Sequence, residues 1–269
     1  AKNTEFARVR LKGSSHAVGY NVGIHGKYEG WSIGARYLSA LGFHYTGADA
    51  TFTQQATNLF LAQNNVIAPR GAAVPLDLLL QGQFTGSGAL TNQYGDSRIT
   101  NPWQAQAGIG YSGFAGTTLS ADVVRFGWSK FGSLPVTFNG NAAAKSRSLI
   151  EDYHDTWSYR FGAEHMVHST GLLDGWTGRA GYSYAESPAP DVTVTPLLPD
   201  MNRRNVSAGL GIPFGPRYRL DAAYLHVNTP GRRGRIVERT LVSQTAQQLN
   251  TGAYDLKADV ISLSLNANF

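Results

Sequence analysis

Apolar and polar side chains alternate along most of this chain of 269 residues. The last nine residues, 261–269, show the pattern most clearly: odd positions are apolar or small, and even positions are Ser or Asn. Successive side chains of a β-strand point to opposite faces, so this segment predicts a strand with one apolar and one polar face. Similar alternation predicts nine strands in all, at residues 18–25, 31–41, 103–111, 119–123, 157–164, 176–184, 206–212, 219–224 and 261–269, with 4–12 as a tenth candidate.

The connections between these segments alternate between short and long. The short ones are residues 27–30, 112–116, 168–175 and 213–216, and the long ones are 46–100, 131–154, 186–202 and 229–253. Outer-membrane barrels have short periplasmic turns and long extracellular loops, and a periplasmic C-terminus would put every long connection outside. The pattern predicts a single all-β domain, 1–269, that is a transmembrane antiparallel up-and-down β-barrel. The alternative is a soluble β-sandwich, which has no reason to obey this parity.

The composition agrees with a membrane barrel. Only 15% of the residues are charged, although glycine is abundant and 11% of the residues are aromatic. An ordinary soluble domain has roughly 25% charged residues. The longest apolar runs are far shorter than the ~18 residues that a transmembrane helix requires. The chain has no cysteine, which excludes disulfides and thiolate metal sites within it.

Nothing in the sequence indicates an enzyme, a metal site or a cofactor. The histidines are scattered, and the closest two, His165 and His168, have no carboxylate-rich neighbour that would complete a metal site. The net charge is +5, but its densest run, Arg232-Arg233-Gly234-Arg235, is short and lacks interleaved aromatics. We therefore expect no nucleic-acid partner. This run is expected to be a solvated loop tip, with binding of lipopolysaccharide phosphates as the alternative.

Four charged residues are predicted to face the lumen of the barrel by alternation: Arg36, Arg160, Glu164 and Arg179. Their ordinary role would be to form ion pairs with one another or with neighbouring strands. Alternatively, one of the arginines meets the carboxylate of a substrate, because a guanidinium can bind a carboxylate with two parallel hydrogen bonds. Both interpretations remain open at this point.

The long segment 46–100 is rich in apolar residues for an extracellular connection. Loops longer than about 12–15 residues are usually functional or disordered. A short helix is expected within it, with helix-forming residues at 53–64. The segment either folds over the barrel as a lid or presents an apolar groove to a hydrophobic substrate. The candidate groove residues are Leu59, Phe60, Leu61, Leu78, Leu80 and Phe84.

Several segments resemble the FadL/TodX (OmpP1) family of outer-membrane transporters for long-chain fatty acids and other hydrophobic compounds. The C-terminal Phe269 is similar to the end of outer-membrane barrels generally, although Ala267 stands where an aromatic is more usual. The resemblance covers essentially the whole chain, through LKG at 11–13 running into GYNVG at 19–23, GWSKF at 127–131, DYHDTW at 152–157 followed by GAE at 162–164, RAGYSY at 179–184, SPAP at 187–190, TPLLPD at 195–200 and residues 254–269.

The resemblance implies a fourteen-stranded barrel with an N-terminal plug in its lumen. The family's Asn-Pro-Ala plug motif is absent here, as are counterparts of the first five strands, so the chain is expected to be roughly the C-terminal two-thirds of a family member. The implied function is passive uptake of hydrophobic molecules, such as fatty acids or aromatic hydrocarbons, through the Gram-negative outer membrane. The expected partners are that substrate, outer-membrane lipid and lipopolysaccharide, with a monomeric state. The alternatives are a structural or adhesive surface barrel and a non-specific porin.

Overall fold

The computed structural model describes residues 5–61, 73–142, 146–194, 199–237 and 248–267. The chain divides into two compact units. The larger unit contains residues 19–41, 101–132 and 151–269, and the smaller unit contains residues 1–18, 42–100 and 133–150. Each unit is built around an antiparallel sheet, and no helix in the described ranges has the length and apolar character needed to cross a membrane.

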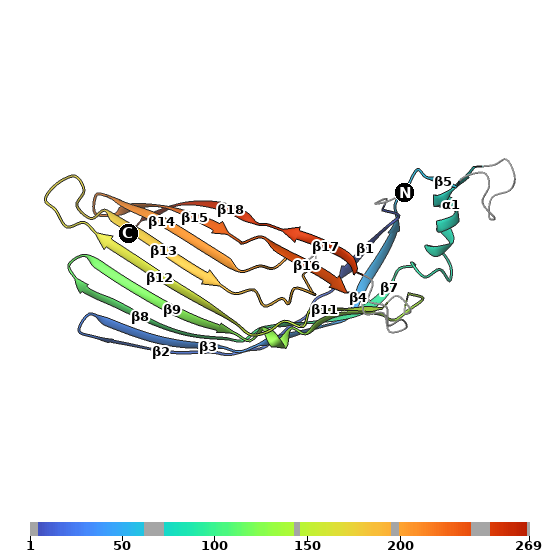
Figure 1. Ribbon diagram of the computed structural model, residues 1–269, viewed down its shortest axis with the longest axis horizontal. Coiled ribbons are helices and arrows are strands. Elements are labelled where there is room, and N and C mark those ends of the chain that lie inside the picture. Colours follow the sequence, from blue (N-terminus) through green and yellow to red (C-terminus); the bar gives the residue numbers. More distant parts are fainter. Residues whose placement is uncertain (1–4, 62–72, 143–145, 195–198, 238–247, 268–269) are drawn as a thin grey trace. The chain divides into compact units, whose positions relative to one another are not determined.

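The larger unit contains a nine-stranded sheet with the strand order β18-β15-β14-β13-β12-β9-β8-β3-β2. All nine predicted strands form within the described residues, with 268–269 at the end of the last one lying outside them, and each strand lies beside its predicted neighbour in an up-and-down arrangement (Figure 1). Every pair in this sheet is antiparallel. Its strands are β2 (Asn21–Tyr28), β3 (Trp31–Leu38), β8 (Gln104–Phe114), β9 (Thr117–Phe126), β12 (Thr156–Met166), β13 (Thr177–Ala185), β14 (Arg203–Phe214), β15 (Tyr218–Asn228) and β18 (Lys257–Ala267).

Two of the short connections are tight turns whose backbone requires unusual conformations. Glu29 and Gly30 join β2 to β3, and both have a positive φ, of 45° and 82°. Two consecutive residues of this kind form the two-residue hairpin turn whose twist matches that of the strands. Gly116, with φ of 69°, turns β8 into β9 in a similarly short connection. The short turns predicted at 27–30 and 112–116 are therefore confirmed.

The smaller unit contains a five-stranded sheet with the order β1-β4-β7-β10-β11. The tenth candidate strand forms here, as β1. Each strand of this sheet is next in sequence to one strand of the larger sheet. The strand order β1-β4-β7-β10-β11 corresponds in this way to β2-β3-β8-β9-β12. The bounds are β1 (Ala7–Lys12), β4 (Leu41–Gln54), β7 (Gln93–Asn101), β10 (Ser133–Phe138) and β11 (Arg147–Ile150).

The segment 46–100 is less of a loop than expected. Its ends are strands, because β4 continues to Gln54 and β7 begins at Gln93. The short helix is α1 (Leu76–Leu80), followed by the 3-10 turn η1 (Gln81–Gln83). The expected position of the helix, 53–64, was wrong for the residues described there: they hold the end of β4 and strand β5 (Phe60–Leu61), which pairs with β6 (Val74–Pro75).

The core of the smaller unit is formed by one face of its sheet. Ala48, Ala50 and Phe52 alternate along β4 and are buried. Phe84, Leu90 and Phe138 pack against Ala50, Phe52 and Ala142, and the rings of Phe52 and Phe138 lie 5.4 Å apart. This cluster joins the connection after α1 to the sheet, so Phe84 is a packing residue of the unit.

The nine-stranded sheet has one apolar and one polar face. Strand register places Ile24, Ala35, Ala107, Val123 and Tyr159 in one row across five strands. Residues of this face are widely exposed, and Ile261, Leu263 and Leu265 reach 77%, 70% and 68%. We call it the outward face, because so large an exposed apolar surface requires a lipid or protein cover. The opposite, polar face is called the inward face.

Candidate functional site

The four predicted lumen residues all lie on the inward face. Arg36 on β3 is opposite Gln106 on β8, and Arg160 on β12 is opposite Asp122 on β9. Glu164 on β12 is opposite Arg179 on β13. Alternation therefore assigned these side chains to the correct face, but the structure gives them different surroundings.

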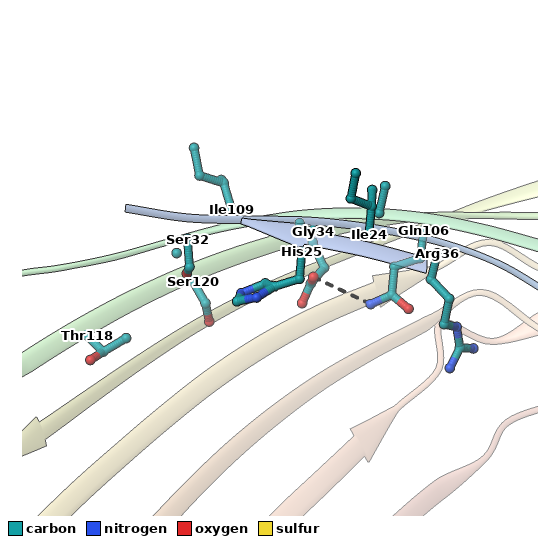
Figure 2. A pocket seen from close by; sticks show the side chains of 13 residues that line it. Ile24, His25, Ser32, Gly34, Arg36, Gln106, Ile109, Thr118 and Ser120 are labelled. Atoms are coloured by element: carbon teal, nitrogen blue, oxygen red, sulfur yellow. Dashed lines mark hydrogen bonds between the residues drawn. The ribbon is translucent and has the colours of Figure 1, made fainter. Parts of the chain in front are cut away.

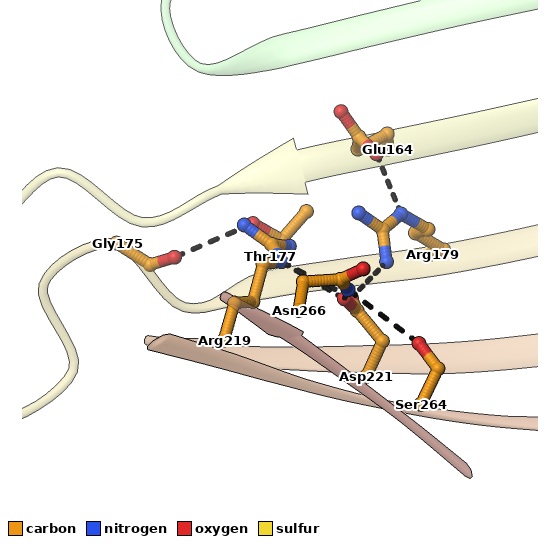
Figure 3. Close-up of polar contacts among 8 residues, drawn as sticks. All are labelled: Glu164, Gly175, Thr177, Arg179, Arg219, Asp221, Ser264 and Asn266. Carbon is orange, nitrogen blue, oxygen red and sulfur yellow. Dashed lines mark hydrogen bonds and ion pairs between the residues drawn. The ribbon is translucent and has the colours of Figure 1, made fainter. Parts of the chain in front are cut away.

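Arg179 is the centre of an ion-pair network on the inward face (Figure 3). Its Nε donates to Glu164 Oε2 at 2.6 Å, and its Nη1 donates to Asp221 Oδ1 at 2.8 Å. Asp221 on β15 also accepts from Arg219 Nε at 3.1 Å and from Asn266 Nδ2 at 3.0 Å. The network joins four strands, β12, β13, β15 and β18. For Glu164 and Arg179 the arrangement matches the structural interpretation, since they neutralise each other on neighbouring strands.

Arg36 lies in a different setting, beside a hollow of about 400 Å³ on the inward face of β2, β3, β8 and β9 (Figure 2). The hollow exists partly because glycines line it: a Cβ on Gly110 would lie 2.7 Å from the Ser32 hydroxyl oxygen. Arg36 Nη2 donates to Gln104 Oε1 at 3.5 Å, and no carboxylate in the described ranges pairs with it. The other polar lining side chains are His25, Ser32, Gln106, Thr118, Ser120 and Asp122.

Most of the polar side chains that line this hollow are uncharged. Gln106 Nε2 donates to Asp122 Oδ1 at 3.5 Å, so the single lining carboxylate is already engaged. In the described part of the chain, no group of three or more His, Asp or Glu side chains is placed to hold a metal ion. Arg36, which lies beside this hollow and pairs with no carboxylate in the described ranges, is a candidate for contact with the carboxylate of a ligand.

The predicted groove residues all belong to the smaller unit, where the stretch around Leu59 lies beside the start of α1. Leu76 N donates to Leu59 O at 2.8 Å, which places the start of α1 beside β5. Asp77 also holds α1 close to the segment before β5, because its carboxylate accepts hydrogen bonds from Thr57 N at 3.0 Å and from Thr57 Oγ1 at 2.5 Å. The hydrogen bonds from the Thr57 hydroxyl and backbone lower the pKa of Asp77. This contact holds two apolar stretches side by side.

The candidate groove residues differ in their exposure to solvent. Phe60 is 64% exposed and Leu78 is 63% exposed. Leu59, Leu61 and Leu80 are half-buried. Phe84, in contrast, packs against the core of the unit. Phe60 and Leu78 are therefore exposed to solvent, whereas Phe84 has a packing role.

A cluster that was not predicted as a site brings distant sequence motifs together in the larger unit. The rings of Trp128 and Phe131 lie 5.8 and 5.2 Å from that of Tyr153. Ser129 N donates to Asp155 Oδ1 at 3.0 Å, and His154 N donates to Pro188 O at 3.0 Å. The sequence signal was the runs GWSKF, DYHDTW and SPAP, which resemble family motifs and meet here.

Glu151 in this cluster is fully buried, and neither of its carboxylate oxygens has a hydrogen-bond partner in the described residues. Burial raises its pKa above the ordinary 4.5. Burial, followed by the charges of Glu151 and Asp200, also raises the pKa of Tyr153 to about 12. The carboxyl group is thus held where its charged form is disfavoured.

We predict that Glu151→Gln raises the melting temperature of the protein at pH 7. When folding raises the pKa of an acid, that group stabilises the folded protein fully at pH values below its pKa in the unfolded chain. This contribution is lost as the pH rises through the pKa of the folded state. The amide removes this loss, so the gain should shrink as the pH falls toward 4.5. Thermal unfolding at several pH values tests this, with the exposed Glu5→Gln as the control. An equal gain at low and neutral pH would refute the assignment.

The run at 232–235 is not the solvated loop tip that was expected. Arg232 begins strand β16 (Arg232–Val237), which pairs with β17 (Gln248–Tyr254). Its guanidinium donates to Asp191 Oδ1 at 2.8 Å, to Ser187 Oγ at 2.8 Å and to Ala189 O at 2.6 Å. Arg232 is thus used to hold the segment that follows β13.

Comparisons with known proteins agree with this architecture. The family model described as outer membrane protein transport protein (OMPP1/FadL/TodX) matches residues 2–269. A FadL homologue from Pseudomonas aeruginosa has a TM-score of 0.67 at 21% identity, covering 93% of this chain and 52% of that one. The toluene transporter TodX from Pseudomonas putida has a TM-score of 0.54 at 18% identity, covering 95% and 50%.

These similarities to solved structures establish the fold, and the chain spans about half the length of both structures. A search of curated proteins finds no match. The family match, in contrast, extends over nearly the whole chain and agrees with the up-and-down sheet and its apolar outward face. The chain therefore belongs to the OMPP1/FadL/TodX family of outer-membrane transport proteins, and its place is the outer membrane of a Gram-negative cell.

Proposed function

We propose that the protein carries hydrophobic small molecules passively across the outer membrane, with long-chain fatty acids and aromatic hydrocarbons as the substrate classes. The observation that carries this proposal is the exposed apolar surface of Phe60 and Leu78 on a segment held in place by Asp77. Such side chains are costly to leave in water unless something covers them. A hydrocarbon substrate would be captured because each buried CH₂ contributes about 0.8 kcal/mol.

Arg36 supports a preference for substrates with an acidic head group. It lies beside a hollow on the inward face and has no carboxylate partner in the described ranges. A guanidinium can bind a carboxylate through two parallel hydrogen bonds, which gives it a natural partner in a fatty acid. A neutral hydrocarbon gains nothing from this contact.

Uptake by Gram-negative cells that lack related transporters tests both parts of the proposal. Cells that make the protein should accumulate radiolabelled oleate or toluene faster than cells that do not. Arg36→Gln should slow oleate uptake several-fold and leave toluene uptake unchanged, because only oleate carries a carboxylate. Equal uptake with and without the protein for both compounds would refute transport. A loss for both compounds in the variant would refute the head-group role alone.

A non-specific polar pore is the second candidate, and the network around Arg179 favours it. Two arginines and two carboxylates lie together on the inward face, as opposed charges do in a polar channel. Liposomes that contain the protein should swell in small sugars if this function is correct. Hydrophobic uptake without sugar permeation would leave the first proposal alone.

A further inference from the structure

Three polar residues interrupt the apolar outward face of the nine-stranded sheet. Arg204 on β14 is opposite Asn228 on β15, and Asn228 is opposite Lys257 on β18. All three side chains are exposed. They share their face with Val206, which is 55% exposed, and with Ile261, which is 77% exposed. The register thus aligns two cationic side chains, with an amide between them, on an otherwise apolar surface.

The row lies at one end of its strands. Strand β14 begins at Arg203, β15 ends at Asn228 and β18 begins at Lys257, so the row is remote from the short turn between β14 and β15. Short turns of outer-membrane barrels are periplasmic, which puts the row at the extracellular end. Tyr184 is directly opposite Arg204. Tyrosines of this kind mark the level of the lipid head groups.

Within the described ranges, neither Arg204 nor Lys257 has an acidic partner within ion-pair distance. Arg125, another cation of the outward face, is already used: its guanidinium lies 4.8 Å from the centre of the Trp157 ring and 3.6 Å from Asp155. The row therefore differs from Arg125 in having positive charge without a protein counter-charge.

One acidic residue, Asp259, lies near the row, and its negative charge would repel an anion bound there. Asp259 is two residues along β18 from Lys257, which is about 7 Å for an extended strand. Its Oδ1 accepts from the Tyr224 hydroxyl at 2.6 Å and lies 2.8 Å from His226 Nδ1. The carboxylate is therefore engaged with two side chains of the neighbouring strand β15. Its removal should strengthen rather than weaken anion binding at Arg204 and Lys257.

We propose that Arg204, Asn228 and Lys257 form a site for a phosphate group of lipopolysaccharide, the phosphorylated lipid of the outer leaflet. Adjacent strands are about 4.8 Å apart, so the two cationic residues are separated by roughly 10 Å along the sheet. Their long side chains can converge from both sides on one phosphate, with the Asn228 amide as a donor between them. Arginine is suited to this role because its planar fork matches phosphate geometry. The site is independent of what the protein transports.

The test is retention of lipopolysaccharide by protein purified from outer membranes and examined by native mass spectrometry. Basic residues at a membrane surface each favour anionic lipid by about fivefold, and salt reduces this effect. Arg204→Gln combined with Lys257→Gln should therefore lower the affinity for added lipid A about tenfold. Dephosphorylated lipid A should bind wild type and variant equally. Asp259→Asn should bind lipid A at least as well as wild type.

Arg203→Gln is the matched control, because it removes the same charge one residue away on the inward face of β14. It should retain lipid A at the wild-type level. Equal loss in this control, or no loss in the double variant, would overturn the proposed site. Preferential retention of a phospholipid over lipid A would also overturn it. A heat-dependent shift in gel mobility verifies that each variant is folded before its lipid content is compared.

Discussion

Replacing Leu59, Phe60 and Leu61 together with serine should reduce uptake of a hydrophobic substrate by roughly 100-fold at low concentration. The estimate takes about 1 kcal/mol of lost apolar contact for each side chain, below the value for full burial. Phe60 is 64% exposed and the two leucines are half-buried, so their loss removes ligand surface more than protein core. The measurement is the initial rate of labelled oleate uptake.

Phe84→Ser is the matched comparison for this prediction. Phe84 packs against Ala50, Phe52 and Ala142. Its loss should lower the stability of the smaller unit, because a core aromatic is replaced by a small polar residue. The amount of protease-resistant protein in the membrane should fall for Phe84→Ser and stay constant for the triple variant. Unchanged uptake in the triple variant would make the segment a lid without a binding role.

Arg179→Met should destabilise the larger unit, raising the ratio of unfolded to folded protein about tenfold at a fixed urea concentration. The variant leaves the Glu164 carboxylate without its cation, whereas Asp221 keeps only Arg219 of its two arginines. Leaving a charge without its partner costs more than the intact pair contributes. The effect stays moderate because Arg179 and Glu164 are 40% and 43% exposed, so water screens both charges.

Arg160→Met is the control for this second prediction. Arg160 lies on the same face, and in the described ranges no ion pair involves it. The stability of the Arg160→Met variant should therefore differ little from that of the wild type. Combining Arg179→Met with Glu164→Gln should recover most of the lost stability, since Asp221 keeps Arg219 as its cation and no unpaired carboxylate remains. Failure of this rescue, or an equal effect of Arg160→Met, would show that the network is not the cause.

Local alternation was enough to predict the nine strands and the face of each charged lumen residue. It was less informative in 46–54, which was assigned to the long connection although Ala48, Ala50 and Phe52 alternate in β4. The position of the helix was also missed. Strand β5 forms near Phe60 because it pairs with β6, and α1 is attached through Asp77 to Thr57, a contact between residues 20 apart. Tertiary pairing decided both outcomes.

By itself, the sequence determined the nine strands of the larger sheet and the face that each of their side chains occupies, because the side chains of a strand repeat every two residues. Only the tertiary structure decided which charges meet. Arg179 finds Asp221, which is 42 residues away, because β13, β14 and β15 pair in one particular register. The same registers align Arg204 with Lys257 across β15. Register depends on the whole sheet, and so the identity of each polar partner does too.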